Sequence, residues 1–142
     1  MTSLFDVNVL VALFDAAHVH HDAAHAWLSL NRASGWASCP ITQNGCVRVL
    51  SQPRYPGALA VGEISRRLRN ATREPDHEFW PDTLSVCDPQ RFRLEQVVTP
   101  RPLTDLYLLA LAVENGGRLV TFDRAIPLTA VVGAQKEHLM VL

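Results

Sequence analysis

The feature that most constrains the fold is a helix followed at once by a strand in the second half of the chain. The stretch "PLTDLYLLALAVENGG" (102–117) is rich in Leu and Ala, has Thr104 or Asp105 at its start and ends on Asn-Gly-Gly, which is typical of a helix and its C-terminal stop. The next residues, "RLVTFD" (118–123), have the apolar run of a short buried strand. A helix that feeds directly into a strand predicts that the two run antiparallel.

The rest of the chain repeats this alternation. Further strands are predicted at 3–6, 35–40, 81–88 and 138–142. Helices are predicted soon after Asp6, over 20–33, over 43–52 with Thr42 as its cap, and in an amphipathic stretch after Pro56; 89–96 is expected to form a short helix or turn, and 124–135 an irregular or short helical segment. Strands that alternate with helices of ten or more residues indicate parallel β-α-β units. The predicted fold is therefore α/β, a three-layer α/β/α sandwich with a central, mainly parallel sheet.

Length and composition favour one globular domain over residues 1–142. Apolar residues make up 48% and charged residues 19%, and a chain of this length can bury roughly 68–70% of the surface that its unfolded form exposes. No basic segment precedes the first apolar residues, which Asp6 and Asp15 interrupt, so no secretory signal is expected. No apolar stretch approaches the roughly 20 residues that span a bilayer. We expect a single domain in the cytoplasm, with no membrane partner.

Three aspartates fall where a parallel sheet would bring them to one edge. Asp6 follows the first strand at its carboxyl end, and Asp123 follows "RLVTF" in the same way. Ligands of open parallel sheets bind beyond the carboxyl ends of the strands, so both residues are expected at that edge. Asp105 lies in the first turn of a helix that runs antiparallel to the strands and begins at the same edge. Three carboxylates are thus expected to converge.

Converging carboxylates need a compensating charge. At about 4 Å, each pair costs on the order of 4 kcal/mol at an effective dielectric constant of 20. Mg²⁺ or Mn²⁺ prefers oxygen ligands, commonly binds one or two carboxylates with substrate phosphate, and lowers the pKa of a bound water. Asp6, Asp105 and Asp123 are therefore candidate catalytic metal ligands for phosphodiester hydrolysis. Each also has a structural alternative: Asp6 can bond its own turn, Asp105 can favour the helix dipole, and Asp123 can cap a turn.

The charges are unevenly distributed along the chain. The net charge is −1, but residues 48–73 contain six arginines against a single acid, Glu63, so this segment carries +5 and the remainder −6. Such a separation suits a nuclease, whose arginines hold phosphates while its carboxylates hold metal. The candidate RNA contacts are Arg48, Arg66, Arg67 and Arg69. The alternative is a solvated helix face that happens to be rich in arginine.

These segments resemble a known family. "SLFDVNVLVALF" is similar to the opening of a PIN domain, "LTDLYLLALAVENGGRLVTFD" is similar to its second half, and the size and order of elements match across essentially the whole chain. Within that family, the compact size and the stretch from His21 to Trp27 resemble the toxins of bacterial VapBC toxin–antitoxin pairs. The resemblance implies a Mg²⁺- or Mn²⁺-dependent endoribonuclease, the toxin of a type II system, usually homodimeric and held inactive by a cognate antitoxin protein.

The resemblance also implies roles for single residues. The three aspartates match acidic positions of the family, and Asn8 matches a polar residue two positions after the first of them. The family commonly has a Glu at the start of the helix after the second strand, where this sequence has Gln43 and Asn44. Asn44 would then serve as a neutral ligand or as a hydrogen-bond donor to a ligand. The fourth ligand and the number of metal ions stay open.

Other classes of function match the sequence less well. A phosphatase of the haloacid dehalogenase type expects a second Asp where Asn8 stands, a receiver domain expects an adjacent acidic pair, and dinucleotide binding requires a Gly-rich turn that is missing here. His21 and His25 have the spacing of helix-borne zinc ligands, but no third ligand accompanies them. The non-enzymatic alternative is a catalytically weakened module that binds RNA or protein, and the missing Glu is the observation that favours it.

Overall fold

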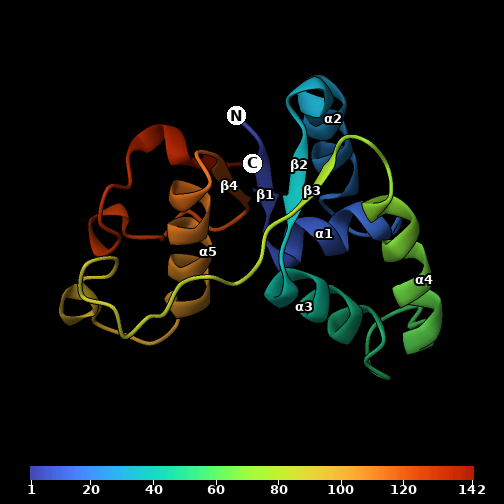
Figure 1. The fold of residues 1–142 in the computed structure, drawn as a ribbon. Coiled ribbons are helices and arrows are strands. Elements are labelled where there is room, and N and C mark those ends of the chain that lie inside the picture. Colours follow the sequence, from blue (N-terminus) through green and yellow to red (C-terminus); the bar gives the residue numbers. More distant parts are fainter.

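A five-stranded sheet forms the centre of the computed structural model, which describes residues 1–142 (Figure 1). The strands are β1 (Ser3–Phe5), β2 (Trp36–Ser38), β3 (His77–Phe79), β4 (Arg118–Thr121) and β5 (Leu139–Val141). They lie in the order β3-β2-β1-β4-β5, and every neighbouring pair is parallel. The prediction of a three-layer sandwich around a mainly parallel sheet is confirmed.

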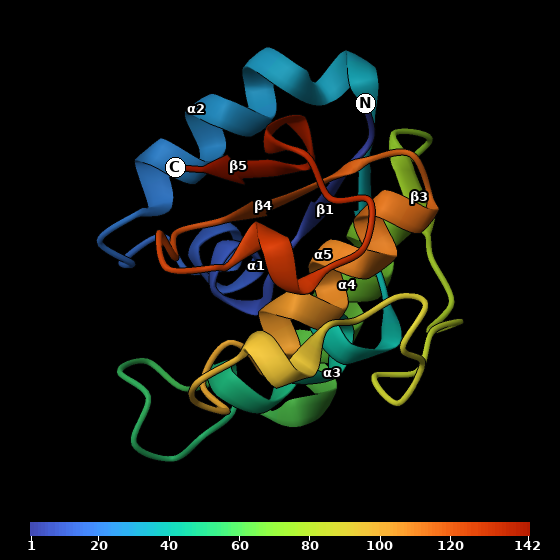
Figure 2. The same ribbon diagram turned by 90° about the vertical axis from the view of Figure 1, so that its left-hand side faces the viewer.

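The helices cover the two faces of the sheet unequally. One face carries α1 (Val7–Phe14), α2 (His21–Asn31), α3 (Pro40–Leu50) and α4 (Val61–Thr72), and the other carries α5 (Leu103–Glu114), as Figures 1 and 2 show. Short 3₁₀ helices occur at Arg32–Ser34, Leu94–Gln96, Leu128–Ala130 and Lys136–His138. None of the helices combines the length and the apolar character that a membrane crossing would require.

Alternation along the strands produces two hydrophobic cores. Leu4 and Leu119 pack in the core beneath α5, whereas their neighbours Phe5 and Val120 pack in the core on the side of α1. This is the expected result of side chains that point to opposite faces at successive strand positions. The helix α5 is buried on all sides, from Leu106 to Ala112, which explains why its sequence is apolar without a clear polar stripe.

The strand order determines where a ligand can bind. After β1, the chain adds β2 and β3 on one side of it, and then returns to add β4 and β5 on the other side. The connection therefore reverses direction between β1 and β4, and such a switch point leaves a crevice beyond the carboxyl ends of the two strands. Asp6 directly follows β1 there, and Asp123 comes two residues after the end of β4.

One predicted strand was wrong. The third strand is His77–Phe79, and residues 81–88, predicted as a strand, contain none. The side chains of β3 are exposed or half-buried because the strand lies at the edge of the sheet, so it lacks the apolar pattern that marks a buried strand. Its pairing with β2 continues only as far as Trp80, whose N–H donates to the Ser38 carbonyl at 2.9 Å.

Two predicted helix starts were also shifted. The helix predicted to follow Thr42 begins at Pro40 with Cys39 as its N-cap, and the Thr42 hydroxyl accepts the Cys39 N–H from inside the first turn at 3.0 Å. Proline is well suited to the first position of a helix because its missing N–H has no partner there in any case. The helix expected soon after Pro56 begins only at Val61.

Candidate active site

Asp6 is a buried carboxylate that is fixed from two directions. Its side chain is 4% exposed. As the N-cap of α1, it accepts the Val9 N–H on Oδ1 at 2.7 Å, which satisfies one of the free donors of the first turn. Its Oδ2 accepts the Thr121 hydroxyl at 2.5 Å. Each oxygen can still accept a further bond, so these two hydrogen bonds orient the carboxylate and leave it able to act as a ligand.

Thr121 links Asp6 to Asp123, and the sequence did not indicate this role. Its hydroxyl donates to Asp6 and accepts the Asp123 N–H at 3.0 Å. A fully buried threonine thus joins groups from β1 and β4 that are more than a hundred residues apart in the chain. The available signal was its place in "LVTFD", as a polar residue between apolar ones, two positions before Asp123.

Asp105 lies close enough to both other aspartates to interact with them electrostatically. Burial raises the pKa of Asp105, and the charge of Asp123 raises it further. Burial also raises the pKa of Asp6 to about 6, with a smaller contribution from Asp105, against the lowering effect of the hydrogen bonds from Thr121 and Val9. The first turn of α5 therefore brings its carboxylate to the edge where β1 and β4 end.

The donor set at this edge fits a hard divalent cation that has few protein ligands. All three side chains offer only carboxylate oxygens, which Mg²⁺ and Mn²⁺ prefer. No three His, Cys, Asp or Glu side chains lie close enough to enclose an ion by themselves. Mg²⁺ typically retains several waters and takes further ligands from substrate phosphate, so an incomplete protein shell is compatible with its chemistry. Burial raises the pKa of both Asp6 and Asp105 and a neighbouring carboxylate raises each further, so a bound cation would favour the charged form of both.

The pKa of Asp6 predicts how stability depends on pH in the absence of metal. Because the folded-state pKa of about 6 exceeds the ordinary 3.8, protonated Asp6 contributes stability that is full below pH 4 and is lost as the pH rises through 6. The unfolding free energy in EDTA is expected to fall by about 1.4 kcal/mol between pH 5 and 7.5 on account of this group. Urea denaturation of wild type and Asp6→Asn measures it: the variant should lose that part of the slope, and an equal slope in both proteins would contradict the assignment.

The two asparagines implied by the resemblance lie differently with respect to the aspartates. Asn8 is exposed in the first turn of α1, and its backbone N–H slightly lowers the pKa of Asp6. Asn44 is exposed in the second turn of α3, and its side chain makes no hydrogen bond with any of the three aspartates. A role for either side chain at a metal ion stays a prediction.

The structure divides the predicted RNA-binding arginines into two groups. Arg66 and Arg67 both pair with Glu63 on their own helix, at 2.8 Å and 3.0 Å. Arg48 on α3 and Arg69 on α4 are exposed and form no ion pair. Only the second group presents guanidinium groups that no carboxylate neutralises.

The histidines weighed as zinc ligands instead connect two helices. A ring nitrogen of His21, Nδ1, lies 2.7 Å from the Ala12 carbonyl, and Nε2 of His25 lies 3.1 Å from the Leu13 carbonyl. These carbonyls belong to the last turn of α1, so the pair joins α2 to the end of α1. No third ligand of the kind zinc requires accompanies them.

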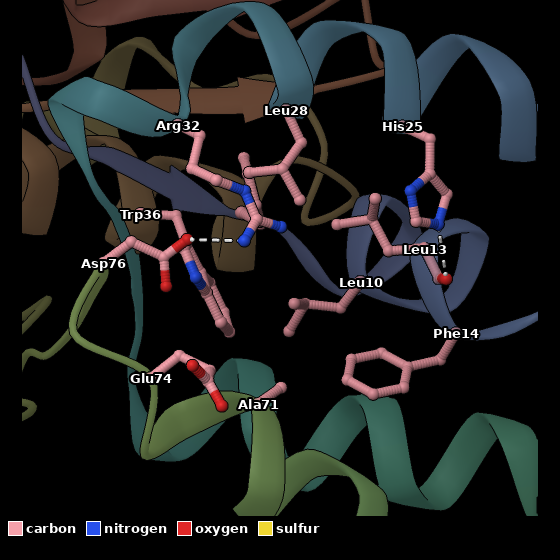
Figure 3. Close-up of a pocket in the computed structure, with 11 residues that line it drawn as sticks. Leu10, Leu13, Phe14, His25, Leu28, Arg32, Trp36, Ala71, Glu74 and Asp76 are labelled. Carbon is pink, nitrogen blue, oxygen red and sulfur yellow. Dashed lines mark hydrogen bonds and ion pairs between the residues drawn. The ribbon is translucent and has the colours of Figure 1, made fainter.

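An apolar cavity of about 190 Å³ lies elsewhere, among α1, α2 and the end of α4 (Figure 3). Its walls include Leu10, Phe14 and Leu28, and the ion pair between Arg32 and Asp76, with a separation of 3.3 Å, lies at one end. None of the three aspartates lines it. The cavity is therefore separate from the acidic edge, the edge of the sheet at which Asp6, Asp105 and Asp123 lie.

The sequence is similar to those of known proteins over nearly its whole length. The family model of the PIN domain matches residues 3–132. The chain is 51% identical over 142 residues to Ribonuclease VapC44 of Mycobacterium tuberculosis (strain ATCC 25618 / H37Rv), with complete coverage of both chains. It is 40% identical over 138 residues to Ribonuclease VapC39 of the same strain, covering 94% of this chain and 96% of the relative.

A comparison of structures gives the same fold. The chain matches a crystal structure of VapBC2 from Rickettsia felis bound to a DNA fragment from their promoter, with a TM-score of 0.65 and 17% sequence identity, covering 100% of this chain and 98% of the other. At that identity the likeness concerns the fold alone. With the family match over nearly the whole chain and the full-length sequence similarity, the chain belongs to the PIN-domain family, among its VapC-type members.

Proposed function

We propose that this protein is a metal-dependent endoribonuclease that hydrolyses RNA phosphodiester bonds and acts as the toxin of a type II toxin–antitoxin pair. The observation that carries the proposal is the position of Asp105, whose carboxylate interacts with Asp123 and with the buried, fixed Asp6 at one edge of the sheet. The full-length similarity to proteins named as ribonucleases supports RNA as the substrate.

The proposed ligands are Asp6, Asp105 and Asp123. When bound, Mg²⁺ or Mn²⁺ would offset the repulsion among these carboxylates, polarise the phosphodiester and lower the pKa of a water. Asp6 contributes a carboxylate whose orientation is set by the hydrogen bonds from Thr121 and Val9, so little reorganisation is needed on binding. The Thr121 hydroxyl also accepts the Asp123 N–H, so this one side chain helps to fix the positions of two proposed ligands relative to each other.

A small antitoxin is the proposed protein partner, and the chain itself is proposed to form a homodimer in the cytoplasm. The structural match to a protein of a VapBC pair supports the antitoxin. The homodimer follows from the family resemblance. Sedimentation equilibrium of the purified chain, alone and with the product of an adjacent small reading frame, would measure both assemblies.

A second candidate function is a module that binds RNA without cleaving it. The specific observation in its favour is that Asn44 stands where the family commonly has a Glu, which leaves one carboxylate fewer at the edge. The two functions predict the same binding of RNA and differ only in turnover.

The test is the cleavage of mixed RNA by the purified chain in Mg²⁺, in Mn²⁺ and in EDTA. Cleavage is expected with either metal, none in EDTA, and recovery when excess Mg²⁺ is added back. Undiminished cleavage in EDTA would overturn the metal-dependent mechanism. Binding of RNA without cleavage under every condition would support the second candidate instead.

A further inference from the structure

A polar groove of about 410 Å³ lies between α3 and α4. Gln43 and Asn44 line it from α3, and Ser65, Arg69 and Thr72 line it from α4. No carboxylate is among its lining residues. The side chains of Asn44, Ser65 and Arg69 make no hydrogen bond or ion pair within the protein, so they remain available to a ligand.

The charge of this groove differs from that of the rest of the same helix. Glu63 accepts hydrogen bonds from both Arg66 and Arg67, and neither of these arginines lines the groove. Arg69 is left as the one cationic side chain in the groove. Arg69 and Arg48 are therefore among the exposed arginines of residues 48–73 whose charge no carboxylate neutralises. Arg48 lies one helical turn after Asn44.

The groove begins beside the acidic edge. The helix α3 starts directly after β2, at the end of the sheet where β1 and β4 also terminate. Gly45 lies against Val7, the residue that follows Asp6: a Cβ atom added at Gly45 would stand 3.1 Å from Val7 Cγ1 and nearer still to Cγ2. Asn44, which precedes Gly45, thus lies on the part of α3 that packs next to the Asp6 turn.

We infer that the groove between α3 and α4 holds the sugar–phosphate backbone of the RNA on one side of the cleaved bond, with Arg69 contacting a phosphate. This inference rests on the proposed function, because it places the RNA strand next to the proposed metal ligands. The neutral amide and hydroxyl groups of Asn44 and Ser65 can bond phosphate or 2′-hydroxyl oxygens, which are the usual partners of such side chains. The apolar part of the lining includes Val61, which is 60% exposed, but no aromatic side chain that would anchor a peptide.

The test compares Arg69→Gln with Arg66→Gln. Both remove one guanidinium from α4, but Arg66 is already paired with Glu63 and does not line the groove. Binding of a fluorescein-labelled single-stranded RNA of mixed sequence is measured in EDTA at several salt concentrations. We expect Arg69→Gln to weaken binding about 5- to 10-fold and to reduce the salt slope by about 0.7, and Arg66→Gln to change affinity less than about 2-fold. Arg69→Lys, which retains the charge, should retain the slope.

Each outcome decides the inference. Equal binding by wild type and Arg69→Gln, or equal losses in Arg69→Gln and Arg66→Gln, would overturn it. A loss that appears only for a purified antitoxin, and not for RNA, would also overturn it and assign the groove to the protein partner. The nuclease proposal is tested separately by turnover in Mg²⁺: a protein whose RNA binding depends on Arg69 but which never cleaves would sustain the groove and refute the nuclease.

Discussion

Replacing Asp105 with Asn is expected to lower the rate of RNA cleavage at least about 100-fold, which corresponds to about 3 kcal/mol of transition-state stabilisation. The charge of Asp105 raises the pKa of Asp6, and the charge of Asp123 raises that of Asp105, so the loss of Asp105 removes one of the interacting negative charges at the acidic edge. Its side chain makes no hydrogen bond within the protein, and burial already disfavours its charged form. The fold should therefore survive, with an unfolding free energy in EDTA equal to or above that of wild type.

The measurement is single-turnover cleavage in Mg²⁺, with the thermal midpoint in EDTA recorded for the same preparations. Asp22→Asn is the matched control, because it makes the same change at an exposed acid in the first turn of α2. Its activity should equal that of wild type. If Asp105→Asn cleaved RNA as fast as wild type, Asp105 would be excluded from the catalytic set. If both variants lost activity alike, the effect would not belong to the acidic edge.

The second large effect concerns the close approach of α1 and α3. In a helix interior, Gly→Ala usually stabilises by up to about 1 kcal/mol, because alanine loses less conformational freedom on folding. Gly45→Ala is expected to do the opposite and destabilise by about 1–3 kcal/mol, since the new methyl group would overlap with Val7. The β-branched side chain of Val7 has few rotamers with which to avoid it. Urea denaturation measures the change.

Val7→Ala provides the compensating variant. Alone, it removes partly buried methyl groups and should be somewhat destabilising. Combined with Gly45→Ala, it should recover about 1 kcal/mol or more, so that the double variant is more stable than Gly45→Ala by itself. Gly62→Ala on α4 is the control, because no atom lies within 4 Å of the Cβ position there, and it should not destabilise. Strictly additive effects of the two substitutions would show that helix contact at Gly45 does not limit stability.

Local patterns in the sequence were sufficient for most of the fold. The apolar helix before Asn-Gly-Gly and the strand after it appear in the structure as α5 and β4, and the terminal strand appears as β5. The edge strand was misplaced because the side chains of His77–Phe79 are exposed or half-buried, so their sequence shows no alternation of apolar and polar residues. The segment "TLSVC" is apolar enough to suggest a strand, but no strand forms there. The helix start at Pro40 was misplaced because threonine is a common N-cap residue, whereas Thr42 here is the third residue of the helix and its hydroxyl accepts the N–H of the cap residue Cys39.

The sequence by itself determined that Asp6 and Asp123 each follow a buried parallel strand and that Asp105 lies in the first turn of the helix before the second of these strands. Each of these features depends on a short run of neighbouring residues. Only the tertiary structure decided what these residues contact. The Thr121 hydroxyl reaches Asp6 from a strand more than a hundred residues away, Gly45 lies against Val7, and Glu63 neutralises two of the arginines while Arg69 remains free. Such pairings depend on strand order, helix packing and side-chain direction, and the periodicity of a single chain does not specify these.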